Sequence, residues 1–177
     1  MRQPFHGCEP DYIAEVCHGR CCESSTHPSG IMVTIHRSEA AAIEAAGGVV
    51  VDGFLAAVDR RCPFKTAADL CGLHGDGDNR TGVTGSGQPF GCVASPFTLN
   101  RNDTLIVRNR YRLLRCYKDG DTPAYRAFAT SLVALFGADR AEFLAAHLEA
   151  GGGDLYTVMA EDVHEKLRAN DNAKRTA

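Results

Sequence analysis

The sequence predicts an α+β fold, with short strands and loops in residues 1–118 and helices in residues 119–177. Three observations support this division. Short β-type runs are confined to the first region, whereas Ala and Leu recur at helical spacing in the second. All eight cysteines occur before residue 118. Because 177 residues suffice for one ordinary core, we expect the second region to pack on the first in one compact domain.

The first region contains signals for strands and for one helix. Strands are expected at residues 31–35, 49–51 and 105–107. Ser38 would cap an alanine-rich helix that ends at the glycine pair 47–48. Seven glycines between residues 72 and 91 predict a long loop. The first region should therefore be small and irregular.

The second region contains end signals for two successive helices. Thr122 followed by Pro123 is a typical helix start, and Gly137 would end this first helix. Asp139 and Glu142 have the spacing of a capping box, which predicts the start of the next helix directly afterwards.

A third helix is predicted after the glycine run 151–153, with Asp154 as its cap. Its apolar residues recur at steps of three and four and would form one stripe: Leu155, Val158, Met159, Val163 and Leu167. Such a stripe must pack on another part of the protein. The polar residues from Asn170 onward are expected to fray.

Composition restricts the compartment and the class of protein. The N-terminus has no apolar run of the kind found in signal peptides, so we expect a cytoplasmic protein with reduced thiols. No run of about 18 apolar residues occurs, which predicts no membrane span. A net charge of −3 does not by itself indicate nucleic-acid binding.

Cysteine usage predicts metal ligation. Where thiols stay reduced, many cysteines favour metal binding over disulfides. Cys21 and Cys22 are adjacent, and neighbouring cysteines seldom bond to each other because the small ring strains the peptide bond. All eight are candidate ligands that would staple the first region: Cys8, Cys17, Cys21, Cys22, Cys62, Cys71, Cys92 and Cys116. The alternative is a set of buried free thiols.

The cysteines follow a recognisable order. A dense group, Cys17-His-Gly-Arg-Cys21-Cys22, precedes a Cys-Pro-Phe element, and two later cysteines follow in glycine-rich or proline-rich turns. This order resembles the cysteine-cluster family with the CxxCxxCC signature, described as a zinc- or iron-chelating domain, whose cluster is similar to that of the flagellin lysine methylases. The resemblance covers residues 8–116 and implies these ligands: Cys17, Cys21, Cys22, Cys62, Cys71 and Cys92. Cys8 lies nine residues before Cys17 instead of three.

The spacing of the cysteines bears on the metal. Zinc sites commonly use Cys-x-x-Cys pairs, and this sequence contains none. We therefore expect an iron–sulfur cluster, of the 4Fe-4S type, with zinc as the alternative. Eight thiols could form two closed four-thiolate sites, or one such site and a cluster with an open position. A purely structural metal remains an equal alternative.

Basic and histidine residues near the cysteines are candidates for substrate binding and catalysis. Arg108, Arg110 and Arg112 alternate along a predicted strand that Cys116 ends, and Arg115 follows them. These arginines could hold a small anionic or nucleotide-linked substrate, or contact nucleic acid. The alternative is a solvated strand face paired with the acidic last helix.

His18 and His74 each flank a candidate ligand and are the candidate catalytic residues; the alternative for each is an exposed histidine. The resulting expectation is an iron–sulfur enzyme, an isomerase or transferase acting in the modification of a nucleobase or protein side chain. The alternative is a non-catalytic zinc- or iron-binding interaction module.

Overall fold

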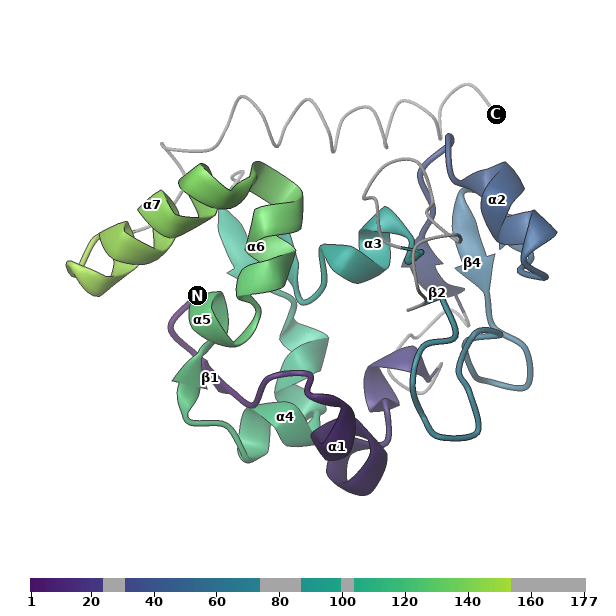
Figure 1. Cartoon of the computed structure of the whole chain (residues 1–177), viewed down its shortest axis with the longest axis horizontal. Helices are drawn as coiled ribbons and strands as arrows, with labels where there is room; N and C mark the ends of the chain where they lie inside the picture. The colour runs from purple at the N-terminus through teal and green to yellow at the C-terminus, as the bar shows by residue number, and fades with distance from the viewer. Residues whose placement is uncertain (24–30, 74–86, 100–103, 154–177) are drawn as a thin grey trace. The chain divides into compact units, whose positions relative to one another are not determined.

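The computed structural model describes residues 1–23, 31–73, 87–99 and 104–153 (Figure 1). Helices and strands are both present, so the α+β prediction is confirmed. The described residues divide into two compact units. The first unit contains residues 1–8, 94–99 and 104–153, and the second contains residues 9–23, 31–73 and 87–93. Residues 94–118, assigned by the sequence to the cysteine-rich region, thus share a unit with the helices that follow them.

Two short antiparallel strand pairs organise the first unit. Strand β1 (Pro4–Phe5) pairs with β7 (Thr122–Pro123), and β5 (Phe97–Leu99) pairs with β6 (Leu105–Val107). Strand β6 confirms the prediction for residues 105–107, whereas β5 was not anticipated. The N-terminal segment is also bound to α4 (Arg115–Lys118), because the His6 amide donates to the Cys116 carbonyl at 2.7 Å.

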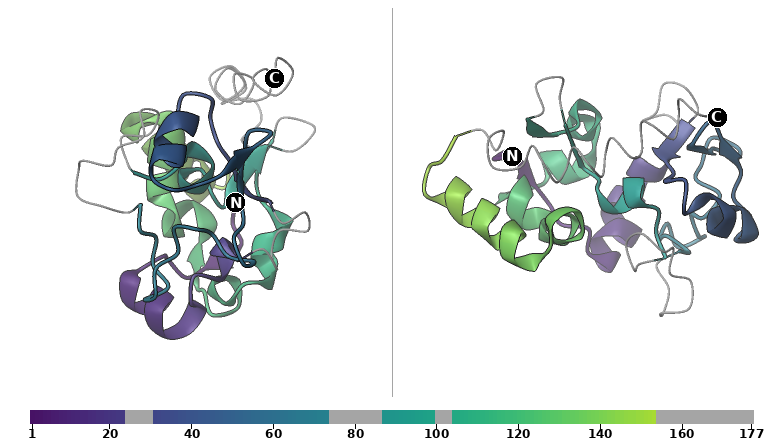
Figure 2. Two further views of the ribbon diagram at one scale, coloured as in Figure 1. Left: turned by 90° about the vertical axis from the view of Figure 1, so that its right-hand side faces the viewer. Right: turned by 90° about the horizontal axis from the view of Figure 1, so that it is seen from above.

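Three further helices complete the first unit: α5 (Ala124–Ala127), α6 (Ala129–Phe136) and α7 (Ala138–Glu149). Figures 1 and 2 show α6 and α7 packed side by side. Gly137, with a φ of 82°, separates them, as predicted, and α7 ends just before Gly151.

Two predicted helix caps in this unit are wrong. Thr122 and Pro123 lie in strand β7, so α5 begins only after them. The capping box of Asp139 and Glu142 does not form, because Glu142 instead pairs with Arg126 at 3.2 Å.

An aromatic cluster stabilises the first unit. The ring of Phe128 contacts Phe5 edge-on with 5.3 Å between centroids, and it lies 6.3 Å from Phe97. Phe5 also contacts Tyr117 at 5.4 Å. Phe128 separates α5 from α6, so this interruption places a large side chain in the core.

The predicted arginine-rich strand is wrong. Residues Asn109–Leu113 form a 3-10 helix, and α4 follows at once. The β5–β6 ladder stops where the Arg108 amide donates to the Pro96 carbonyl. Tyr111 then turns into the core while Leu113 is 76% exposed, so the two do not share a strand face.

A three-stranded antiparallel sheet with the order β2-β4-β3 forms the centre of the second unit. Strands β2 (Ile31–Thr34) and β3 (Val50–Val51) confirm two predicted strands, and β4 (Phe54–Ala56) joins them. The other regular elements are α1 (Pro10–Tyr12), a π-helical turn (Ile13–Cys17), a 3-10 helix (Arg20–Cys22), α2 (Ala40–Ala45) and α3 (Phe90–Val93).

Helix α2 was expected, but Glu39 and not Ser38 organises its start. The Glu39 carboxylate accepts a hydrogen bond from the His36 amide at 2.9 Å and another from the Phe90 amide at 2.8 Å. This carboxylate is completely buried and connects the starts of α2 and α3. Two charge-assisted hydrogen bonds offset the cost of its burial.

The core of the second unit is small and includes cysteines. Its buried residues are Val33, Ile35, Ile43, Leu55 and Leu73, and Cys62, Cys71 and Cys92 pack against them. The predicted third helix and tail, His74 and most of the predicted glycine loop lie outside the described residues. No helix in the described ranges is long and apolar enough to cross a membrane.

Candidate metal centre

The eight cysteines separate into two groups. All are free thiols. Six belong to the second unit: Cys17, Cys21, Cys22, Cys62, Cys71 and Cys92. Cys8 and Cys116 belong to the first unit, where Cys8 is exposed and Cys116 is buried in α4. The sequence offered all eight as candidate ligands without dividing them between sites; the six that the family resemblance implies belong to one compact unit.

The segment from Cys17 to Cys22 is a tight loop. The π-helical turn ends at Cys17, and both His18 and Gly19 are in the left-handed region, with φ of 52° and 53°. The chain then reverses, and the Cys22 amide donates to the Gly19 carbonyl at 2.9 Å. As a result, the Cys21 and Cys22 sulfur atoms lie 4.0 Å apart.

A second loop contains Cys62 and Cys71. The Cys62 amide donates to the carbonyl of Cys22 at 2.9 Å, which connects this loop to the first. Lys65 and Cys71 form an antiparallel bridge, and the Gly72 amide donates to the Phe64 carbonyl at 2.7 Å. The Lys65 amide donates to the Cys62 carbonyl at 3.0 Å. Backbone hydrogen bonding from Phe64 and Lys65 lowers the pKa of the Cys62 thiol, which favours its thiolate form.

Cys92 approaches the same core from α3. Gly91 allows this helix to lie close to strand β2, since a Cβ atom at Gly91 would be 2.5 Å from the Thr34 carbonyl oxygen. The bond from Phe90 to Glu39 fixes the start of the same helix. The position of Cys92 thus depends on contacts from two other segments.

Four thiols in this unit interact electrostatically. The pKa of Cys62 is raised to about 11, chiefly by burial and also by the charges of Cys22 and Cys71, while backbone hydrogen bonding from Phe64 opposes the shift. Burial also raises the pKa of Cys92 well above the ordinary value, and the other three cysteines add to that effect. Cys62, Cys71 and Cys92 also pack against the same core, so charge on one of these thiols disfavours charge on the others.

Hydrogen bonding and burial both favour the thiol form of Cys22. The hydrogen bond with Cys21 is the largest cause of its raised pKa, and burial is the second. The positive charge of Lys65 acts in the opposite direction. A metal cation would remove the repulsion among the four thiolates, which is how metal binding drives deprotonation of such sites.

The fit to a metal is partial in the arrangement described here. Among residues 1–23, 31–73, 87–99 and 104–153, no three His, Cys, Asp or Glu side chains are placed so that they could already hold one ion. All four thiols are half-buried; Cys92 lies in α3, and Cys62 and Cys71 lie in one loop. Ligand sets that close only on binding are common where metal binding and folding are coupled.

Lys65 connects the two cysteine loops. Its side chain is 2% exposed, and its ammonium donates to the His18 carbonyl at 2.5 Å and to the Glu23 carboxylate at 3.1 Å. It also pairs with Asp69 at 3.0 Å. The sequence prediction overlooked Lys65, Glu39 and Asp69; a lone lysine between two candidate ligands is the signal that could have identified Lys65.

His18, one of the two candidate catalytic residues, lies at the edge of this site. Its Nδ1 atom is 3.3 Å from the Asp69 carboxylate, and its side chain is 54% exposed. A histidine oriented by a carboxylate can accept or donate a proton at its other ring nitrogen.

The candidate substrate-binding arginines all belong to the first unit. Arg110 lies over the ring of Tyr111 at 5.3 Å, and Arg115 pairs with Asp119 at 3.0 Å. Arg108 is half-buried, whereas Arg112 is exposed next to Leu113. The four arginines therefore differ in environment and do not form the continuous row expected of a strand.

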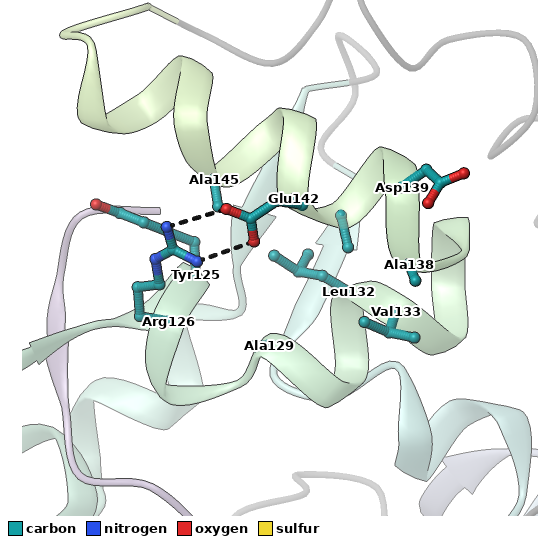
Figure 3. Close-up of a pocket in the computed structure, with 10 residues that line it drawn as sticks. Tyr125, Arg126, Ala129, Leu132, Val133, Ala138, Asp139, Glu142 and Ala145 are labelled. Atoms are coloured by element: carbon teal, nitrogen blue, oxygen red, sulfur yellow. Dashed lines mark hydrogen bonds and ion pairs between the residues drawn. The ribbon is translucent and has the colours of Figure 1, made fainter.

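A cavity of about 350 Å³ lies among α5, α6 and α7 (Figure 3). Much of its lining is small and apolar: Ala129, Leu132, Val133, Ala138, Ala141 and Ala145. Arg126 lies at its edge, paired with Glu142 and Glu149. No cysteine or histidine lines it, so the candidate chemistry resides in the second unit.

Comparisons with protein-family models, with curated proteins and with solved structures found no match to this chain. The assignment of the site therefore depends on the order of its cysteines and on the geometry described above.

Proposed function

We propose that the second unit is a metal–thiolate domain in which Cys22, Cys62, Cys71 and Cys92 bind the metal. The observation that carries this proposal is the packing of Cys62, Cys71 and Cys92 against one small core, together with the hydrogen bond from the Cys62 amide to the Cys22 carbonyl at 2.9 Å. Backbone hydrogen bonding adds support, because it lowers the pKa of the Cys62 thiol. The resemblance to the CxxCxxCC family implies six ligands, and these four are among them.

For the metal, we propose an iron–sulfur cluster, with zinc as the alternative. The absence of Cys-x-x-Cys pairs supports iron. Cys17 and Cys21 share a loop with Cys22 and would be available to a cluster that needs further ligands. An enzymatic role, isomerisation or group transfer, would use His18, oriented by Asp69, as its proton-transfer group. A closed four-thiolate site without open coordination would instead support a structural module.

Anaerobic purification followed by metal analysis tests this proposal. We expect bound iron with acid-labile sulfide and broad visible absorption; bound zinc alone would support the alternative metal. Cys62→Ser should remove most of the metal, whereas Cys8→Ser, at an exposed site in the other unit, should leave the metal content unchanged. Equal metal content in both variants, or none in the wild type under either metal, would contradict the proposal.

We also propose that the first unit binds an anionic partner, nucleic acid, through the segment from Arg108 to Arg115. The specific support is Arg112, exposed beside Leu113, which is itself 76% exposed. An exposed cation next to an exposed apolar side chain suits the phosphates and bases of a single strand.

Binding of a short single-stranded oligonucleotide at low salt checks this second proposal. Arg112→Glu should reduce affinity and the salt dependence of binding. Arg37→Glu makes the same charge change at an exposed site in the other unit and is the control. A similar loss in both variants would indicate a general charge effect and no defined surface.

A further inference from the structure

Lys65 is buried at the junction of the two cysteine loops. An ammonium group has three N–H donors and no acceptor. Here it has three oxygen partners: the His18 carbonyl, the Glu23 carboxylate and the Asp69 carboxylate. Its side chain is 2% exposed, so the protein retains a charge in a place where burial is strongly unfavourable without such partners.

The three partners of Lys65 come from both cysteine loops. His18 and Glu23 enclose the vicinal pair Cys21-Cys22, and Asp69 lies two residues before Cys71. Lys65 itself donates its backbone amide to the Cys62 carbonyl at 3.0 Å. One residue therefore sets the spacing between ligand-bearing segments that are about forty residues apart in the chain.

The ammonium charge also matters to the ligands. Four thiolates around one divalent ion, or around a 4Fe-4S cluster of charge +2, leave a net charge of about −2 in a half-buried site. The Lys65 ammonium lies 3.1 Å from the Glu23 carboxylate, and Glu23 directly follows Cys22. A cation fixed beside the ligands would lower the energy of the metal-loaded form more than that of the neutral thiol form.

We infer that Lys65 is a positioning residue that sets the metal affinity of the centre, by holding the two cysteine loops together and by offsetting the negative charge of the bound thiolates. This inference depends on the proposed metal-binding function. It predicts that loss of Lys65 weakens metal binding even in a variant whose metal-free form is folded.

Titration of the metal-free protein with Co²⁺ tests the inference, because thiolate-to-cobalt absorption reports both affinity and tetrahedral geometry. Lys65→Met preserves the length of the side chain and removes its charge. We expect its Co²⁺ affinity to fall by about 10–100-fold, the range typical for groups that support metal ligands. Lys65→Arg keeps the charge and should bind within a few-fold of the wild type. Lys118→Met, an exposed lysine in the other unit, is the matched control and should bind like the wild type.

Asp69→Asn separates the two parts of the inference. It weakens one contact of Lys65 but retains the ammonium charge, so its affinity should fall less than that of Lys65→Met. Far-UV circular dichroism of each metal-free variant shows whether it folds. If Lys65→Met does not fold, the comparison of Lys65→Arg with Asp69→Asn still decides, because charge compensation requires Lys65→Arg to bind nearly as the wild type does.

Several results would overturn the inference. One is a folded Lys65→Met variant with unchanged Co²⁺ affinity. Another is a folded Lys65→Arg variant as weak as Lys65→Met, which would exclude a role for the charge. If the wild type itself shows no thiolate-to-cobalt absorption, the proposed metal-binding function fails, and this result is distinct from a failure at Lys65.

Discussion

The ammonium nitrogen of Lys65 lies 2.5 Å from the backbone carbonyl oxygen of His18, a residue whose φ of 52° places it in the left-handed region. A non-glycine residue in this region costs about 1–2 kcal/mol. Such strain persists only where surrounding contacts maintain it, and it is concentrated at functional sites. The contact from Lys65 thus holds the loop before Cys21 and Cys22 in a conformation that its own sequence does not favour.

Gly19→Ala should destabilise this loop. A Cβ atom at Gly19 would lie 2.6 Å from the Asp69 carbonyl oxygen, and this backbone atom cannot move aside easily. Gly47→Ala is the control, because Gly47 also has a positive φ but has nothing within 4 Å of the added atom. We expect a loss of about 1 kcal/mol for Gly47→Ala, and roughly 1–3 kcal/mol more for Gly19→Ala. Urea denaturation followed by circular dichroism measures both; equal losses would mean that the loop adjusts.

Glu39→Ala should destabilise the second unit more than Glu44→Ala does. The substitution leaves the part-buried amide of His36 and the buried amide of Phe90 without the carboxylate that accepts their hydrogen bonds. Each unsatisfied amide costs about 1–3 kcal/mol, so a loss of about 2–6 kcal/mol is expected. Glu44→Ala changes an exposed glutamate of the same helix and should alter the free energy of unfolding by less than about 0.5 kcal/mol. The two values from denaturant titration would be similar if Glu39 contributed no buried hydrogen bonds.

Metal binding should protect the thiols unequally against alkylation. A bound metal would shield Cys22, Cys62, Cys71 and Cys92, whereas Cys8 is exposed in the other unit and should react at the same rate with and without metal. Iodoacetamide labelling followed by peptide mass spectrometry measures each site. A chelator should restore the reactivity of Cys62. Protection of Cys8 to the same extent would indicate that the ligand set is not the one proposed.

Leu132→Ala should destabilise the first unit, whereas Val133→Ala, at the adjacent residue, should have little effect. Leu132 belongs to α6 and is 1% exposed. Truncation of such a buried side chain lowers the free energy of unfolding by about 2–5 kcal/mol. Val133 is 44% exposed, so its truncation should cost at most about 0.5 kcal/mol. Thermal unfolding followed by circular dichroism compares the two. A large effect of Val133→Ala would show that its face is covered by another surface.

Local sequence signals predicted the regular elements well where neighbouring residues alone decide them. Gly137 ends α6 because a positive φ is accessible to glycine, and this requirement is visible in the sequence. The aliphatic runs of β2, β3 and β6 were likewise recognised. The same reasoning failed for residues 108–113, because an alternating pattern of arginines does not reveal that the strand ladder stops at the Pro96 carbonyl.

What the sequence by itself determined is the set of eight cysteines, and their order predicts metal binding. Tertiary structure decided which cysteines share a compact unit, since Cys8 and Cys116 share a unit with the helices while six others share a second unit. It also identified Lys65, whose partners lie in both cysteine loops. The physical reason is that ligand type is a property of each residue, whereas electrostatic coupling depends on distances that only the folded chain sets.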